Sequence, residues 1–399
     1  MLSERNGPTV ADVFRAGFDD YLRSKSSLPA QHYTVANAIM DCRTEKLGGR
    51  MYRCEHCGNE VPVFNSCRNR HCPQCQAMAR AEWAAKRMKE LLPVPYFHVV
   101  FTVPEQLRPI ALRNKRCFYN LMFRVVSRTL TELGANPRHL GGAVGFLAVL
   151  HTWTQTVMDH PHIHCLVPAG ALAPDGVEWI PCRKGFLFPV AVVKALYRGK
   201  FIAELKQAVD AGDMQLGGHY AAKGGCYGEF LDGLYQTEWV VYMKSTLQSA
   251  RAVVKYLASY TNRIAISDAR IKALDTEKVT LSYRDRRRGD VERLLTMTPA
   301  AFIGRFLLHV LPRGFVRIRQ YGFMANKNRT EKIAQCRMAV LGGDDFDPLE
   351  DVGHESDIPL QGEPKEPNKP RKCPRCGRRA LLMAEEIPKR RRMPMRKAA

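Results

Sequence analysis

The sequence lacks any apolar segment long enough to cross a membrane. Its longest apolar runs, such as VVFTV and GFLAVL, are far shorter than the roughly 20 residues that a spanning helix needs. The first residues, MLSERNGPTVADVF, also lack the apolar block of a secretory signal peptide. We therefore expect a cytoplasmic protein with no membrane partner.

Acidic residues are scarce relative to basic ones. The chain of 399 residues contains 39 Asp and Glu against 61 Lys and Arg, which gives a formal net charge of +22. This excess favours a polyanionic partner, with nucleic acid as the first choice, and association with the nucleoid. The apolar content of 45% and the charged content of 25% are ordinary for a globular chain, and the length allows two or three domains.

The thirteen cysteines favour metal coordination, because a reducing compartment disfavours disulfides. Two C-x-x-C pairs have zinc-ribbon spacing, and we predict that they hold one structural zinc ion: Cys54, Cys57, Cys72 and Cys75. Three further candidate ligands leave open a second site or a different set of four: Cys42, Cys67 and His71. Cys373-x-x-Cys376 offers only two ligands and is half a site unless another segment supplies two more.

The pattern of apolar residues changes several times along the chain and predicts five segments. Residues 1–35 form an amphipathic helical segment, and residues 36–92 form the zinc-binding module with a basic helix at its end. Residues 93–275 alternate between strand and helix patterns, which predicts an α+β sheet domain. Residues 276–340 carry an arginine-rich hairpin, and residues 341–399 are an acidic and proline-rich linker with a basic tail, expected to be largely disordered.

Histidines stand at alternate positions in the segment DHPHIHCLVPAG. On a strand, His162 and His164 share one face, while Ile163 and Cys165 point to the core. Antiparallel pairing with the preceding segment LHTWTQTV puts Gln155 opposite His162, so Gln155 is the first choice as a third metal ligand and His151 the second. The alternative is that the histidines only line a polar surface.

The segment SARAVVKYLASYTNR predicts a helix with Tyr256 and Tyr260 on one face. Arg251, Lys255 and Arg263 lie nearby in the sequence. A phenol with an ordinary pKa of about 10 is a poor nucleophile at neutral pH, so catalysis by these tyrosines needs a cation or a base beside them. A half-buried packing pair is the alternative.

Taken in order, the cysteine module, FHVVFTVP, HPHIHCLVPAG and KYLASYTNRIAIS resemble the rolling-circle transposases of the insertion-sequence-91 family, which have a histidine–hydrophobic–histidine (HUH) motif and two tyrosines. The resemblance implies a replication-initiator-like fold, an antiparallel sheet with flanking helices, in which FHVVFTVP is a central strand. It implies that His162 and His164 bind Mg²⁺ or Mn²⁺ and that Tyr256 and Tyr260 are nucleophiles. One departure is Asn262, which stands where relatives tend to have a histidine.

The resemblance also implies the chemistry and the partner. The expected activity is the nicking and rejoining of single-stranded DNA at element ends and target, through a 5′-phosphotyrosine link. The three basic residues near the tyrosines, Arg251, Lys255 and Arg263, are expected to contact DNA phosphates. Six further arginines are expected to do the same: Arg284, Arg286, Arg287, Arg288, Arg317 and Arg319. The alternatives are a plasmid replication initiator or relaxase with the same chemistry, and a non-catalytic zinc-containing nucleic-acid-binding protein.

Overall fold

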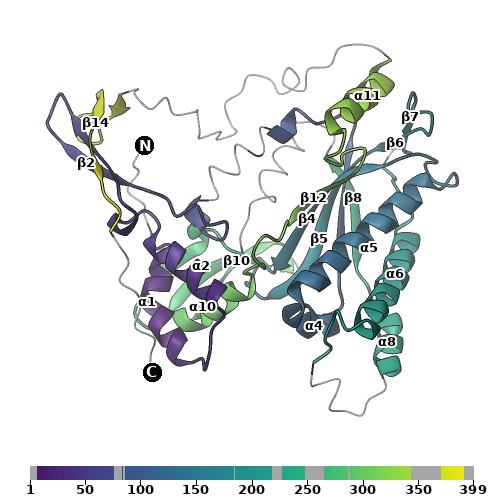
Figure 1. Ribbon diagram of the computed structural model, residues 1–399, viewed down its shortest axis with the longest axis horizontal. Coiled ribbons are helices and arrows are strands. Elements are labelled where there is room, and N and C mark those ends of the chain that lie inside the picture. The colour runs from purple at the N-terminus through teal and green to yellow at the C-terminus, as the bar shows by residue number, and fades with distance from the viewer. Residues whose placement is uncertain are drawn as a thin grey trace.

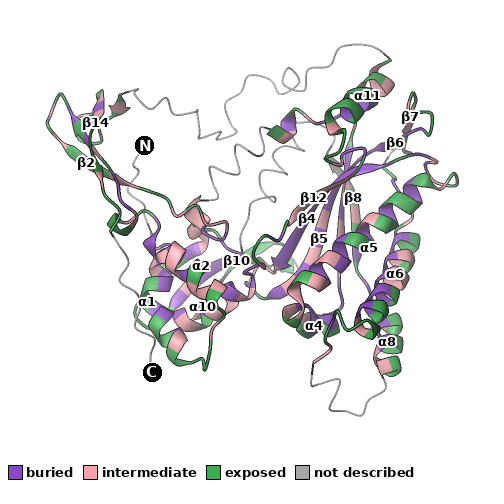
Figure 2. Ribbon diagram, viewed as in Figure 1, coloured by how far each residue is buried: buried purple, intermediate pink, exposed green. Residues whose placement is uncertain are grey.

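The computed structural model describes residues 7–75, 83, 86–183, 185–217, 227–247, 265–285, 288–342 and 370–390. These residues form two lobes and a small projecting ribbon (Figure 1). The sheet lobe lies at the right of the view, the helical lobe at the lower left, and the ribbon above the helical lobe. Buried residues concentrate on the strands of the sheet and on the inward faces of the helices (Figure 2).

A five-stranded antiparallel sheet forms the centre of the sheet lobe. Its order is β12 (Ile318–Gly322), β4 (Gly145–Trp153), β5 (Asp159–Pro168), β3 (Tyr96–Thr102) and β8 (Val241–Leu247). The FHVVFTV segment is therefore an interior strand, between β5 and β8, and β5 is the middle strand. The predicted α+β class with an antiparallel sheet is confirmed.

One face of this sheet is covered by helices. Phe97, Val99 and Phe101 alternate along β3 and are all buried in the main core, as the period of two predicts. The helices and the small strands of this lobe are α4 (Arg108–Arg113), α5 (Lys115–Ala135), α6 (Val190–Asp210), α8 (Tyr227–Gln236), β6 (Gly170–Leu172) and β7 (Trp179–Pro181), with the 3₁₀ turn η2 (Glu105–Leu107). Helices α5 and α6 run along the sheet in Figure 1.

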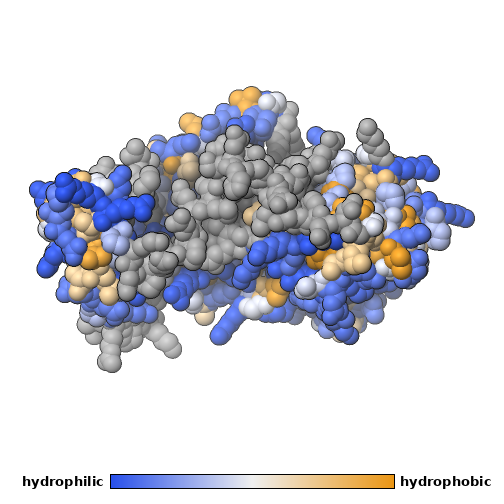
Figure 3. Space-filling model, turned by 90° about the horizontal axis from the view of Figure 1, so that it is seen from above, coloured by the Kyte–Doolittle hydropathy of each residue, from blue (hydrophilic) through white to orange (hydrophobic). Residues whose placement is uncertain are grey.

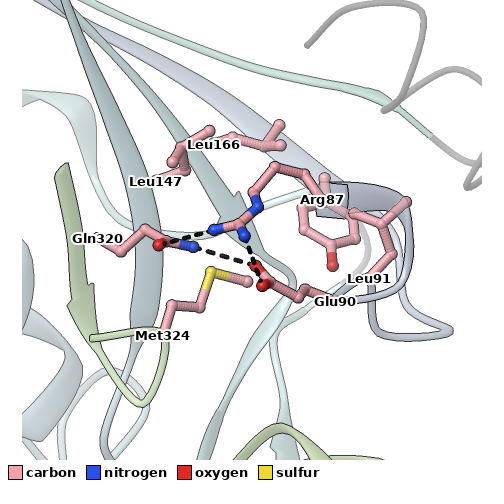
Figure 4. A pocket seen from close by; sticks show the side chains of 8 residues that line it. Arg87, Glu90, Leu91, Leu147, Leu166, Gln320 and Met324 are labelled. Atoms are coloured by element: carbon pink, nitrogen blue, oxygen red, sulfur yellow. Dashed lines mark hydrogen bonds and ion pairs between the residues drawn. The ribbon is translucent and has the colours of Figure 1, made fainter. Parts of the chain in front are cut away.

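On the opposite face of the sheet, the described residues form a second apolar cluster at one end. There, Leu147 and Leu166 pack with α11 (Arg329–Leu341) and the chain around Leu91. A small cavity at this end is bordered by polar side chains (Figure 4). Arg87 donates to Gln320 at 3.1 Å and pairs with Glu90 at 2.9 Å, so buried charge is neutralised at the end of the sheet.

The helical lobe combines the N-terminal helices with a segment more than 200 residues later in the chain. Its elements are α1 (Val10–Arg23), α2 (Ala30–Asp41), α10 (Pro299–Leu308), β9 (Ile271–Leu274), β10 (Val279–Asp285) and β11 (Val291–Met297), with the 3₁₀ turn η3 (Asp268–Arg270). Thr9 and Asp12 form a capping box at the start of α1. A Cβ on Gly17 would lie 2.4 Å from Cβ of Pro299, so this glycine allows α1 and α10 to cross closely.

This packing does not follow the predicted domain boundaries. The expected N-terminal segment 1–35 has no separate core, because α1 packs against α10. The expected extension 276–340 is divided, because β10 and β11 belong to the helical lobe while β12 joins the main sheet beside β4. This arrangement depends on contacts between segments that are distant in the sequence. Such contacts cannot be predicted from the local pattern of apolar residues.

The ribbon is a four-stranded antiparallel sheet in the order β13 (Arg371–Lys372), β14 (Arg379–Ile387), β1 (Gly49–Cys54) and β2 (Glu60–Phe64), and η1 (Glu45–Leu47) precedes it. Strand β14 pairs with β1 along its length, from Gly49 opposite Ile387 to Cys54 opposite Leu381. The expectation of a largely disordered tail is therefore wrong for residues 370–390. The pairing depends on a partner strand more than 300 residues earlier in the sequence, which composition cannot reveal.

Candidate functional site

Three histidines converge on the face of the sheet that α5 and α6 leave free. His151 of β4 lies directly opposite His162 of β5, and His164 is two residues further along. One ring nitrogen from each of the three lies within 4.8 Å of the other two. Ile163 and Cys165, between and beside them, are buried in the main core, as the alternation predicts.

The third member of this cluster is His151, not Gln155. The predicted register placed Gln155 opposite His162, but the turn between the strands falls at residues 154–158, so Trp153 lies opposite Asp159 and His151 lies opposite His162. Gln155 therefore falls in this turn, where its carbonyl accepts a hydrogen bond from Arg270. The irregularity between His151 and Trp153 shifts the pairing by only one residue, so the position of the turn accounts for most of the difference from the predicted register.

Hydrogen bonds orient two of the three rings. The Nδ1–H of His162 donates to the carbonyl of His160 at 2.7 Å, which leaves the Nε2 lone pair available. His164 Nδ1 is joined to Nε2 of His98 on β3 at 2.8 Å, with the two rings stacked. An imidazole whose Nδ1 is held in this way presents its Nε2 to a metal, so the arrangement fits a divalent cation.

His98 was missed by the sequence analysis. Its position in FHVVFTV, one residue from the core positions Phe97 and Val99, was the signal that could have placed it on the histidine face.

Burial keeps His162 neutral. Removal from water lowers its pKa to about 4, and this outweighs the contribution of the His160 carbonyl, which raises it. At neutral pH the ring is therefore unprotonated and able to act as a metal ligand.

The tip of the β4–β5 hairpin is anchored in the helical lobe. Val157 is fully buried in the core of that lobe and has φ of +59°, an uncommon conformation for a β-branched residue. Its carbonyl accepts from Nε2 of His309 at 3.2 Å, and the carbonyl of Thr156 accepts from Arg305 at 3.2 Å. The helical lobe therefore fixes the position of the strands that carry the histidines.

A buried charge lies at the start of β5. Both carboxylate oxygens of Asp159 are buried without a hydrogen-bond partner among the described residues. Burial raises the pKa of Asp159 to about 6, against the opposing effect of the Lys115 and Arg108 charges. Lys115 itself donates to the carbonyls of Leu308 and Val310, at 2.7 and 3.0 Å, and so joins α5 to the end of α10.

The expected nucleophiles Tyr256 and Tyr260 lie outside the described residues, as do Arg251, Lys255 and Arg263. The residues that flank this segment, Leu247 and Ala265, belong to the described part of the chain. Leu247 ends β8 opposite Tyr96 of β3. Ala265 is buried in the helical lobe.

The arginines expected to contact DNA differ in their surroundings. Arg284 and Arg288 are exposed, and Arg284 pairs with Asp290 at 3.1 Å across the hairpin tip. Arg317 is half-buried, and Arg286 and Arg287 lie outside the described residues. The guanidinium of Arg319 lies 4.1 Å from the ring centre of Phe123 and donates to Asn120 at 2.5 Å, so it packs β12 against α5.

Hydrophilic residues cover most of the described part of the face shown in Figure 3.

The cysteines form two clusters, and neither is the predicted set of Cys54, Cys57, Cys72 and Cys75. The first consists of Cys42, Cys67, Cys72 and Cys75, with sulfur–sulfur distances of 3.5 Å from Cys75 to Cys42 and to Cys67. The second consists of Cys54, Cys57, Cys373 and Cys376. The pairs Cys54-x-x-Cys57 and Cys72-x-x-Cys75 have the same local spacing. Only the folded path of the chain therefore decides which cysteines lie together.

His71 belongs to neither cluster. It is buried in the helical lobe, and its Nε2 accepts from the backbone amide of Leu311 at 3.2 Å.

Among the described residues, none of the helices has both the length and the apolar character that a membrane crossing requires. The family model described as "Transposase zinc-binding domain" matches residues 13–103, and that described as "Putative transposase" matches residues 145–332. The chain is 45% identical over 335 residues to "Putative transposase y4qJ" from Sinorhizobium fredii, which covers 84% of each chain. The chain belongs to the insertion-sequence-91 family of transposases.

A more distant relative is the "Transposase for insertion sequence element IS801" from Pseudomonas savastanoi pv. phaseolicola. It is 26% identical to this transposase over 304 residues, which covers 72% of this chain and 69% of the relative. No solved structure matches the chain. Family membership decides between the expected alternatives in favour of a transposase, whose partner is DNA. The zinc-binding domain matched at residues 13–103 contains the whole first cysteine cluster.

Proposed function

We propose that this transposase is a metal-dependent HUH endonuclease that cuts and rejoins single-stranded DNA at the ends of a mobile element, in rolling-circle transposition. The observation that carries the proposal is the convergence of His151, His162 and His164 on the face of the sheet opposite α5 and α6. Three imidazoles, two of them oriented by hydrogen bonds, are a ligand set for a divalent cation, with Mn²⁺ favoured over Mg²⁺ by ligand type and Mg²⁺ by abundance. Bound there, the cation supplies Lewis-acid stabilisation of charge on the phosphate oxygens.

The protein supplies the nucleophile and the geometry. The phenolic oxygen of Tyr256 or Tyr260 attacks the scissile phosphorus, and the bond from phosphorus to the 3′ oxygen breaks. The phenolic proton is lost, the 3′ oxygen takes up a proton, and a 5′-phosphotyrosine link remains. One phosphodiester bond is exchanged for another, so the strand can be rejoined without an external energy source.

The surrounding structure supports this assignment. The hairpin that carries the histidines is held at both ends, by the sheet and by the docking of Val157 in the helical lobe. The segment with the tyrosines begins at the end of β8, beside the strand that carries His98. A single strand is the substrate that fits, because the nucleophile must reach a backbone free of its partner strand.

The test is formation of a covalent adduct. Incubated with single-stranded DNA of an element end and Mn²⁺, the purified protein is expected to form a complex that survives SDS. The double variant Tyr256→Phe with Tyr260→Phe should form none while still binding DNA, and His162→Ala should form little at limiting metal. The exposed Tyr235, which lies on α8, provides a matched control as Tyr235→Phe. An adduct that persists in the double variant would contradict the proposal.

A further inference from the structure

The ribbon contains a cluster of cysteines that extends beyond the matched zinc-binding domain. We propose that Cys54, Cys57, Cys373 and Cys376 bind a second zinc ion, which joins the C-terminal tail to the N-terminal hairpin of β1 and β2. Two of these ligands come from residues 13–103 and two from a segment some 270 residues beyond the end of that match. The site therefore does not exist in either segment alone.

The distances between the sulfur atoms fit tetrahedral coordination. Sγ of Cys54 lies 3.7 Å from Sγ of Cys376, and Sγ of Cys57 lies 3.7 Å from Sγ of Cys373. With zinc–sulfur bonds of about 2.3 Å, the edge of a tetrahedron is about 3.8 Å. All four sulfurs lie within 4.8 Å of one another, so one ion can reach every thiolate.

The two knuckles have nearly the same backbone geometry. The amide of Gly58 donates to the carbonyl of Cys54 at 2.9 Å, and the amide of Gly377 donates to the carbonyl of Cys373 at 2.9 Å. Both glycines have positive φ, of +66° and +72°, which a residue with a side chain rarely adopts. Each C-x-x-C-G segment is thus shaped as a tight turn under its pair of sulfurs, and the two turns face each other.

The apolar core of the ribbon is too small to hold the sheet together by itself. Its fully buried members are Tyr52, Cys54, Cys373 and Leu381, so two of the four are proposed ligands. A unit of this size, below about 40 residues, usually needs a metal, a disulfide or a partner chain. No disulfide joins the described cysteines. The proposed ion supplies the missing stabilisation, because its binding energy contributes directly to folding.

The metal content of the purified full-length protein tests this proposal directly. Plasma mass spectrometry is expected to find two zinc ions per chain in the unmodified protein and one in the Cys373→Ser, Cys376→Ser variant. Cys42→Ser with Cys75→Ser should also remove one ion, from the other cluster. Cys117→Ser with Cys182→Ser is the matched control, because these half-buried cysteines belong to neither cluster, and it should retain two.

A second measurement uses the unmodified protein, so that the proposal can be tested even if the cysteine variants fold poorly. Hydrogen exchange is followed across residues 379–387 in the unmodified protein, before and after titration with a chelator. Loss of one zinc ion should coincide with loss of protection in β14, while β3 and β5 stay protected. A zinc content of one in the unmodified protein, an unchanged content in the Cys373→Ser, Cys376→Ser variant, or protection of β14 that survives removal of both ions would overturn the proposal. None of these outcomes depends on nuclease activity.

Discussion

At the scale of single residues, the candidate cation site depends on how each imidazole is held. His162 is fixed by a backbone carbonyl and His164 by the ring of His98. The sequence predicted the shared face of His162 and His164, because alternation along a strand is a local property. It did not predict His98, and it ranked His151 second to Gln155 as the third ligand, because both positions depend on the pairing between strands.

His98 is expected to act through His164 as a positioning residue. Its loss frees the ring of His164 to rotate, and loss of a partner of this kind typically weakens metal affinity about 10–100-fold. His98→Ala should therefore need more Mn²⁺ for half-maximal adduct formation while reaching a similar rate at saturating metal. His139→Ala is the control, since that ring packs against Phe188 away from the cluster. An unchanged metal requirement, with adduct formation intact, would show that His98 has no positioning role.

At the scale of elements, the hairpin tip links the two lobes. Helices α1 and α5, strand β3 and the hairpin of β10 and β11 agree with the periodicity of the sequence, since each depends on local spacing. The register of β4 on β5 and the grouping of the cysteines could not be predicted in this way. The register depends on where the turn between the two strands falls, and the second cysteine cluster depends on contacts across hundreds of residues.

Val157 at the hairpin tip should contribute to stability through burial. Val157→Ala keeps the unusual backbone angle and removes two buried methyl groups, so the free energy of unfolding is expected to fall by about 2 kcal/mol. Urea denaturation measures this change. Val177→Ala is the matched control, because Val177 is 71% exposed and its truncation should change the stability little. Equal stabilities of the two variants would mean that the tip does not pack as described.

At the scale of the whole molecule, buried histidines connect the lobes. His309 follows α10 and bonds to Thr152 and Val157 of the other lobe's hairpin, and burial lowers its pKa to about 4. Burial likewise lowers the pKa of His71 to about 3, and this ring accepts a hydrogen bond only when neutral. Both rings are therefore unprotonated at neutral pH, where they support the association of the lobes.

Acid should weaken this association in a defined range of pH. The unfolded chain protonates His309 below about pH 6.5, whereas the folded chain does so only near pH 4. The unfolded state thus binds more protons between these values, and stability falls as the pH decreases from 6.5 to 4. The contribution of His309 is of the order of 3 kcal/mol over that range. In His309→Gln the dependence measured by urea denaturation should be shallower; the same slope as in the unmodified protein would contradict the assignment.

The central claim is that His151 completes the cation site of the HUH motif and that Gln155 does not. The most direct measurement compares Mn²⁺-dependent adduct formation on single-stranded DNA by His151→Ala and Gln155→Ala, with folding checked by circular dichroism. The structure predicts that His151→Ala loses the adduct at limiting Mn²⁺ and that Gln155→Ala forms it as the unmodified protein does. Loss in Gln155→Ala together with retention in His151→Ala would contradict the account.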